Sequence, residues 1–267
     1  MARVLTENRE LCEKKCEPYK NMIKEVLERE KEVLASIEKD ATGAAYKRLN
    51  LCDEMIGCAT CYITINNLYV ELVNTKDNDA LNDARKLLYK AIIYLEEIVS
   101  NTVDPTQSDL EDKLALISEA SVEKRFHLIR KLGLAISLLI DAFGDNTKWK
   151  WSFVELQGRY ATVAKNLLDL KKASKDYFDP NSPDYDNSVL YIRLIRKLND
   201  QSATAYRDRY ELSTHRIDDM RLAIQYLSAC RRVAIALGES EEAEEIKKKA
   251  GVWKQKFEAD QKSGRAN

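Results

Sequence analysis

Residues 81–99 read LNDARKLLYKAIIYLEEIV, and this stretch decides the fold class. Its apolar side chains recur every three or four residues, at positions 81, 84, 87, 88, 91, 92, 95, 98 and 99. That spacing places them on one face of an α-helix and leaves the charged residues on the other face. The stretch therefore predicts a helix that buries one stripe against its neighbours.

The same period continues along nearly the whole chain. Its 267 residues include only 8 Gly and 4 Pro, which leaves little material for the turns of a sheet. We expect an all-α protein of eight to ten antiparallel helices in stacked helical hairpins, as a bundle or a short α-solenoid. The expected helices are 6–40 with a kink or late start at Pro18, 49–73, 81–99, 110–117, 122–143, 149–170, 189–198, 202–212, 217–237 and 239–257.

The clearest break in this pattern is DPNSPD at residues 179–184. Pro, Asn and Asp in such density end a helix and start a loop. We expect the loop 179–188 to separate an N-terminal helical-hairpin region, 1–178, from a C-terminal helical subdomain, 189–262. The polar tail 263–267 is expected to be flexible.

Charge and hydropathy narrow the class of partner. Lys and Arg number 43 and Asp and Glu 44, so no net positive charge favours nucleic acid. No apolar run reaches the ~20 residues of a membrane span. The first residues, MARVLTEN, become charged at once and lack the apolar core of a signal peptide. We expect a cytoplasmic protein as written, or a periplasmic one if a leader was removed, with its six cysteines reduced.

Two cysteine pairs, Cys12-x3-Cys16 and Cys58-x2-Cys61, give the four thiols that a structural zinc needs. If a hairpin turns near Gly43, residue 58 lies opposite about residue 25, which is ~20 Å from Cys12 along the helix. We therefore expect core residues at 58 and 61 and a frayed helix end at 12 and 16. A shared zinc site and a redox pair remain as alternatives.

The two histidines occur as Glu123-x3-His127 and Glu211-x3-His215. Both spacings put the two side chains on one helix face, which favours a surface ion pair. Four-helix metal sites use a different spacing and further carboxylates, so we expect no metal and no cofactor here. The chain also lacks a glycine-rich phosphate loop and any recognisable nucleophile, and we assign no catalytic residue.

Residues 148–153, KWKWSF, interleave lysine with aromatic rings. In a helix Trp149 and Phe153 share a face while Trp151 points elsewhere, so at least one ring is expected to be partly exposed. Such rings bind proteins or stack on nucleobases, and these three residues are candidate partner contacts. The alternative is a helix start anchored by core aromatics.

Basic residues gather between 193 and 232, with tyrosines among them. A groove of arginine and tyrosine holds phosphopeptides or acidic tails, which makes Arg193, Arg196, Arg207 and Tyr210 further candidate contacts. Acidic residues are interspersed, so the mixed signs equally favour ion pairs within the chain.

Several resemblances bear on function. The helix count resembles the layout of phosphoserine-binding 14-3-3 adaptors, and residues 217–260 are similar to a tetratricopeptide-like helix pair through Ala223, Tyr226, Ala234, Ala243 and Ala250. The segments KWKWSFVEL (148–156) and YELSTHRIDDM (210–220) resemble the all-helical flagella-associated proteins of spirochaetes. That resemblance implies a structural component of the periplasmic motility apparatus, and hence export.

Together these observations favour a non-enzymatic structural or scaffold protein. Its expected partner is another protein or a second copy of the chain, and the assembly that the resemblance implies is a motility apparatus. The alternatives are a metal- or cofactor-holding helical bundle and a phosphopeptide-binding adaptor.

Overall fold

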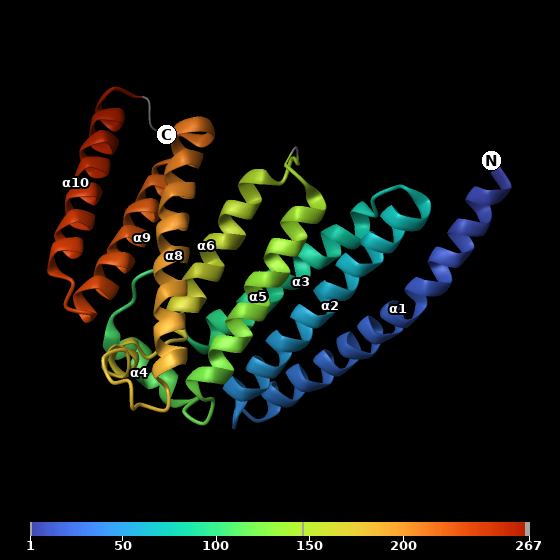
Figure 1. Ribbon diagram of the computed structural model, residues 1–267, viewed down its shortest axis with the longest axis horizontal. Coiled ribbons are helices and arrows are strands. Elements are labelled where there is room, and N and C mark those ends of the chain that lie inside the picture. Colours follow the sequence, from blue (N-terminus) through green and yellow to red (C-terminus); the bar gives the residue numbers. More distant parts are fainter. Residues whose placement is uncertain (1, 146, 265–267) are drawn as a thin grey trace. The chain divides into compact units, whose positions relative to one another are not determined.

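Figure 1 shows the computed structural model, which describes residues 2–145 and 147–264. All regular secondary structure within these ranges is helical, which confirms the expected all-α class. Ten α-helices and one π-helical turn, η1, follow one another in the order α1 (Ala2–Lys39), α2 (Ala44–Val73), α3 (Asn78–Ile98), α4 (Gln107–Ala115), α5 (Val122–Phe143), α6 (Lys150–Asn166), α7 (Leu170–Asp176), α8 (Tyr185–Arg209), η1 (Tyr210–Thr214), α9 (Ile217–Ala236) and α10 (Ser240–Lys262).

The chain forms two compact units. The first comprises residues 1–98 and 128–148, and the second comprises residues 99–127 and 149–267. The connection 177–184 joins α7 to α8 inside the second unit, and residues 185–188 of the expected loop form the first turn of α8. The two units thus differ from the predicted regions 1–178 and 189–262. Of the predicted tail 263–267, residues 265–267 lie outside the described ranges.

The first unit is built on two helical hairpins, in which α2 packs against both α1 and α3. Arg29 Nη2 lies 2.8 Å from Glu54 Oε1, and Cys61 Sγ lies 3.7 Å from Met22 Sδ. These pairs fix a register in which residue 58 lies opposite residue 25, as predicted. Because α2 has a neighbour on each side, it buries residues all around its surface, including Met55, Ile56 and Ile63.

A buried carboxylate ties α1 to α3. Glu30 is 3% exposed, accepts a hydrogen bond from the hydroxyl of Tyr94, and lies 2.6 Å from Nζ of Lys90. The carboxylate therefore has the paired surroundings that a buried charge requires.

Pro18 lies inside α1, so the predicted late start at this residue is wrong. Proline removes one hydrogen bond to the carbonyl four residues earlier. Here Pro18 and Lys14 are both on the exposed side of the helix, where water can replace the lost donor.

The second unit is built on α6, α8, α9 and α10. The helix α8 runs unbroken through residues 199–201, where two separate helices were predicted. Asn199 is fully buried and its amide donates to the carbonyl of Ile195 at 2.7 Å, so this polar residue stays within the helix rather than ending it. The connection at 116–121 separates α4 from α5, and α6 ends at Asn166, ahead of the short α7.

The α9–α10 hairpin has the predicted arrangement of small residues. Gly238 adopts a φ of 72° at the turn, a conformation that glycine tolerates best. Ala223, Tyr226, Ala234 and Ala243 are buried, and Ala250 packs against the same core.

One glycine in α6 is required by packing. The stacked rings of Tyr206 and Tyr226 lie against Gly158, where a methyl group would sit 2.6 Å from Cε2 of Tyr206 and 2.9 Å from Oη of Tyr226. Both rings are buried and cannot swing into solvent. The absent side chain therefore allows α8 and α9 to approach α6.

We predict that Gly158→Ala lowers the free energy of unfolding by about 1–3 kcal/mol, because the two rings must shift in a packed core. Gly251→Ala is the matched control, since Gly251 is helical, exposed and has no atom within 4 Å of the added methyl group. It should be neutral or stabilise by up to about 1 kcal/mol. Urea denaturation measures both, and equal effects would contradict the proposed clash.

Candidate functional site: an arginine–aromatic cluster at the π-turn

The end of α8 departs from regular helix. Residues 210–214 form the π-helical turn η1, which closes with a hydrogen bond from the amide of His215 to the carbonyl of Tyr210 at 3.1 Å. His215 has a φ of 51°, which is uncommon for a residue other than glycine. π-Helical turns of this kind occur frequently at functional sites.

A buried ion pair holds this turn. Asp219 at the start of α9 is 2% exposed and accepts from Nε of Arg209 at 3.0 Å and from the hydroxyl of Thr214. Arg209 also donates to the carbonyl of Trp151 at 3.2 Å and lies over the ring of Tyr206, 4.7 Å from its centroid. One guanidinium thus links α6, α8 and α9.

The two predicted clusters therefore meet at Arg209. Trp149 and Trp151 are half-buried, and Nζ of Lys150 lies 5.3 Å from the ring of Trp151. Phe153 is only 5% exposed and belongs to the interior, as the alternative interpretation of this segment held. It is removed from the candidate surface.

Tyr210 is also an interior residue. It is 1% exposed, and its hydroxyl donates to Oδ2 of Asp260 at 2.9 Å. Burial and the neighbouring carboxylate raise the pKa of Tyr210 to about 12. Its role is to join η1 to α10, and it too leaves the candidate surface.

Of the predicted arginines, two make ion pairs within the chain. Arg196 binds Glu239, with Nη1 to Oε2 at 2.9 Å, and Glu242. Arg207 lies 5.3 Å from the centroid of Trp253 and 3.6 Å from Glu211. Arg193 is exposed on the outward face of α8. Arg196 and Arg207 thus form the ion pairs within the chain that the alternative interpretation predicted, whereas Arg193 is exposed to solvent.

The N-terminal cysteine pair is more deeply buried than predicted, whereas Cys61, expected in the core, is half-buried. Cys12 and Cys16 are both 0% exposed, with their Sγ atoms 4.0 Å apart, so the expected frayed end is wrong. The neighbouring Glu13 accepts from the hydroxyl of Tyr69, which fastens this part of α1 to α2. All six thiols are free, and the described residues contain no group of three or more His, Cys, Asp or Glu arranged to hold a metal ion.

The two histidines differ from each other. His127 Nε2 lies 3.8 Å from Glu123 on the surface, as predicted. Among the described residues His215 forms no ion pair with Glu211: Glu211 lies within η1 and binds Lys256, and His215 follows the turn with a left-handed backbone. The edge of the Tyr210 ring packs near the His215 ring at 5.9 Å.

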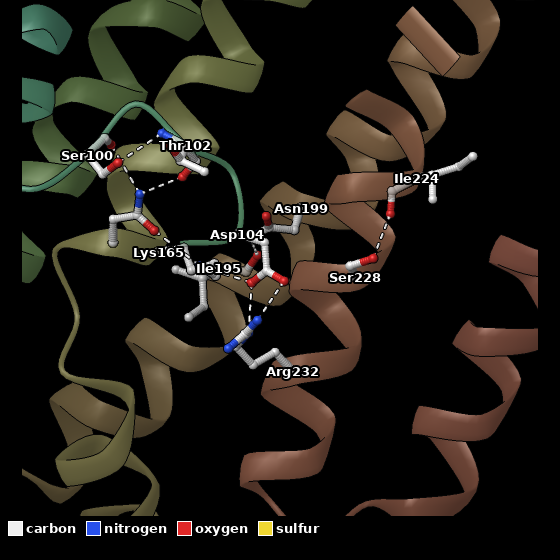
Figure 2. A network of polar contacts seen from close by, with 10 residues as sticks. Ser100, Thr102, Asp104, Lys165, Ile195, Asn199, Ile224, Ser228 and Arg232 are labelled. Atoms are coloured by element: carbon white, nitrogen blue, oxygen red, sulfur yellow. Dashed lines mark hydrogen bonds and ion pairs between the residues drawn. The ribbon is translucent and has the colours of Figure 1, made fainter. Parts of the chain in front are cut away.

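Sequence reasoning missed a second polar network, half-buried and shown in Figure 2. Asp104 binds Arg232 in a bidentate manner, at 2.7 and 2.8 Å, and lies 3.7 Å from Nζ of Lys165. The amide of Asn166 donates to the carbonyls of Ser100 and Thr102 at 3.1 and 2.9 Å. These contacts fasten the connection 99–106 to α6 and α9. No local sequence pattern predicts these contacts, because the partners are more than 60 residues apart in the chain.

Lys165 is 4% exposed, and burial lowers its pKa to about 8, against the opposing effect of Asp104. Its Nζ donates to Oδ1 of Asn166 at 3.1 Å. The side chain is enclosed by the chain itself, so we assign it a structural role.

Fold and cluster together define the class: an all-α protein of packed helical hairpins with a π-turn braced by a buried ion pair. None of the helices within the described ranges combines the length and apolar composition of a membrane-spanning helix. The chain belongs to the TP0443 family, whose family model matches residues 8–261. That family is named for a protein of the spirochaete Treponema pallidum. Comparison with curated proteins finds no match.

We predict that Asp219→Ala lowers the free energy of unfolding by about 3 kcal/mol or more, because it leaves Arg209 partly buried without its counter-charge. The double variant Arg209→Met with Asp219→Ala should lose clearly less than the sum of the two single variants. Urea denaturation of the three variants completes the cycle. Strict additivity would show that the pair does not act as a unit.

A second prediction concerns pH. The folded-state pKa of Lys165, about 8, lies below the usual 10.5, so between these values the unfolded chain binds more protons. The contribution of Lys165 to the free energy of unfolding therefore rises with pH, by at most about 1.4 kcal/mol per unit. The free energy of unfolding of the unmodified protein, minus that of Lys165→Met, should therefore become more positive from pH 8 to pH 10.

The cysteine thiols are present in both proteins, so their contribution to the pH dependence cancels in this difference. A difference that stays constant with pH, measured by urea denaturation at five pH values, would mean that Lys165 keeps its ordinary pKa.

Proposed function

We propose that this protein is a non-enzymatic scaffold that binds another protein through the surface around η1. The observation that carries the proposal is Leu212, which is 75% exposed at the middle of that turn. A single exposed apolar side chain is common on protein surfaces. Leu212 differs in that a buried ion pair fixes the turn that carries it. A side chain held in place loses little conformational entropy on binding, which favours recognition.

The surroundings of Leu212 suit a binding surface. Trp149 and Trp151 are half-buried residues in the same cluster, and aromatic residues of this kind often supply most of the energy of an interface. Arg207, just before the turn, and Glu211, within it, lie 3.6 Å apart and have partly exposed charges. Apolar anchors surrounded by charged side chains are the usual composition of a protein-binding site.

The partner we favour is a component of the motility apparatus of a spirochaete. Two arguments support this: the resemblance of residues 148–156 and 210–220 to flagella-associated proteins, and membership of a family named for a spirochaete protein. Both segments lie in or next to the cluster at η1. In this role the protein would act in the periplasm.

We predict that Leu212→Glu weakens partner capture at least about tenfold, because it puts a charge at an apolar anchor. Affinity capture with cross-linking and mass spectrometry, from extracts of the source organism, measures the effect. Ile235→Glu is the control: it introduces the same charge at an exposed position (54%) on the same unit, about 24 Å further along α9 from Asp219.

A partner lost with Leu212→Glu and retained with Ile235→Glu would support the site. Equal recovery with both variants would contradict it, as would recovery of this chain alone. In the latter case sedimentation over a range of concentrations would test self-assembly.

A further inference from the structure

A second surface of the same unit is a groove of about 640 Å³, formed by the end of α4, the start of α5 and the short α7. This volume lies within the range of ligand-binding pockets. Leu114, Ala115 and Val122 give it an apolar lining. Its remaining walls are charged, with four basic side chains, Arg125, Lys171, Lys172 and Lys175, and three acidic ones, Glu111, Asp169 and Asp184.

The three carboxylates are already engaged. Glu111 lies 3.5 Å from Nζ of Lys171, and Asp184 binds Lys172, which also contacts Asp176 at 3.0 Å. Asp169 caps α7 by accepting from the backbone amide of Lys172. Each acidic group of the groove thus has a donor within the protein.

Two of the cations lack such a partner. Lys175 is exposed and forms no ion pair within the described part of the chain. Arg125 is half-buried, and it donates to the carbonyls of Ala120 at 2.8 Å and Leu167 at 3.2 Å rather than to a carboxylate. A guanidinium has five N–H donors, so about three remain for an acceptor in the groove.

The carbonyl contacts also fix the position of Arg125. They come from both sides of the groove, from the turn before α5 and from the turn after α6. An arginine positioned in advance, with unused donors and no neutralising acid, suits the planar acceptors of a carboxylate.

We propose that this groove binds an acidic peptide segment of a partner protein. Carboxylates of the segment would accept from Arg125 and Lys175, and an apolar side chain beside them would pack on Ala115 and on the accessible edges of Leu114 and Val122. The apolar lining favours a peptide over a small inorganic anion, since an anion would leave that lining uncovered. This surface is distinct from the one around Leu212, and either can fail without the other.

The test uses two fluorescein-labelled peptides, Glu-Leu-Glu-Glu-Leu-Glu and the same peptide with Gln in place of every Glu. Fluorescence anisotropy with the full chain should show binding of the acidic peptide, weakened by added salt, and at least roughly tenfold weaker binding of the Gln peptide. Inorganic phosphate as a competitor distinguishes a simple anion site. Displacement of the peptide at micromolar phosphate would contradict the peptide proposal.

We predict that Lys175→Glu weakens binding of the acidic peptide roughly tenfold, because an attractive charge becomes repulsive. Lys197→Glu is the matched control: it makes the same change on the exposed face of α8, about 20 Å along the helix from Asp184. It should alter binding about twofold or less, since solvent and salt screen charges at that distance.

Lys175 is exposed, so its replacement should leave the fold intact, which circular dichroism verifies. Equal effects of the two variants would overturn the proposal, because they would report net charge rather than a site. So would equal affinity for the two peptides, or no binding of either at millimolar concentration.

Discussion

The carboxylate of Asp219 determines how α8 gives way to α9. A buried charge must be paired, and the pairing with Arg209 brings the last residue of α8 against the first turn of α9. The same guanidinium contacts the carbonyl of Trp151 and the ring of Tyr206, so the start of α6 is positioned by the same interaction. The turn that carries the exposed Leu212 and the backbone at the half-buried Trp151 are both held by this pair.

A second group of polar contacts holds a segment without regular structure in place, as Asp219 holds the turn at η1. The connection 99–106 lies against α6 and α9 because Asn166 satisfies two of its carbonyls and Asp104 binds Arg232. Without Asn166 the carbonyls of Ser100 and Thr102 would lose the donor that holds this connection against α6. In the second unit, therefore, apolar stripes bring the helices together, whereas polar side chains determine how the helices are joined.

Much of the fold could be predicted from the sequence. The apolar period gave the helices, and the α1–α2 hairpin has the register deduced from a turn at Gly43, because a helical hairpin with a short turn has little freedom to slide. Breaks were harder to place. Asn199 predicted a break but is buried, with its amide hydrogen-bonded to the carbonyl of Ile195. Pro18 predicted a kink or a late helix start but lies inside α1, on its exposed face.

The candidate site was predicted only in part. Residues 148–153 and 193–232 were chosen by composition, and the structure brings them together at Arg209. Composition did not indicate which members are buried, so Phe153 and Tyr210 were wrongly included. The π-turn and the groove beside α7 could not be predicted, because each depends on contacts between separate helices, such as that of Arg209 with the carbonyl of Trp151.

The burial of the cysteines has a chemical consequence. Burial raises the pKa of Cys16 and Cys58 to about 11 and that of Cys230 to about 12. A thiol with a pKa of 11 is ionised in about one molecule in ten thousand at pH 7, and only the thiolate attacks a disulfide. Exchange with small oxidants is thus slowed by both steric shielding and weak acidity. In the folded chain these three thiols are therefore weak nucleophiles at neutral pH.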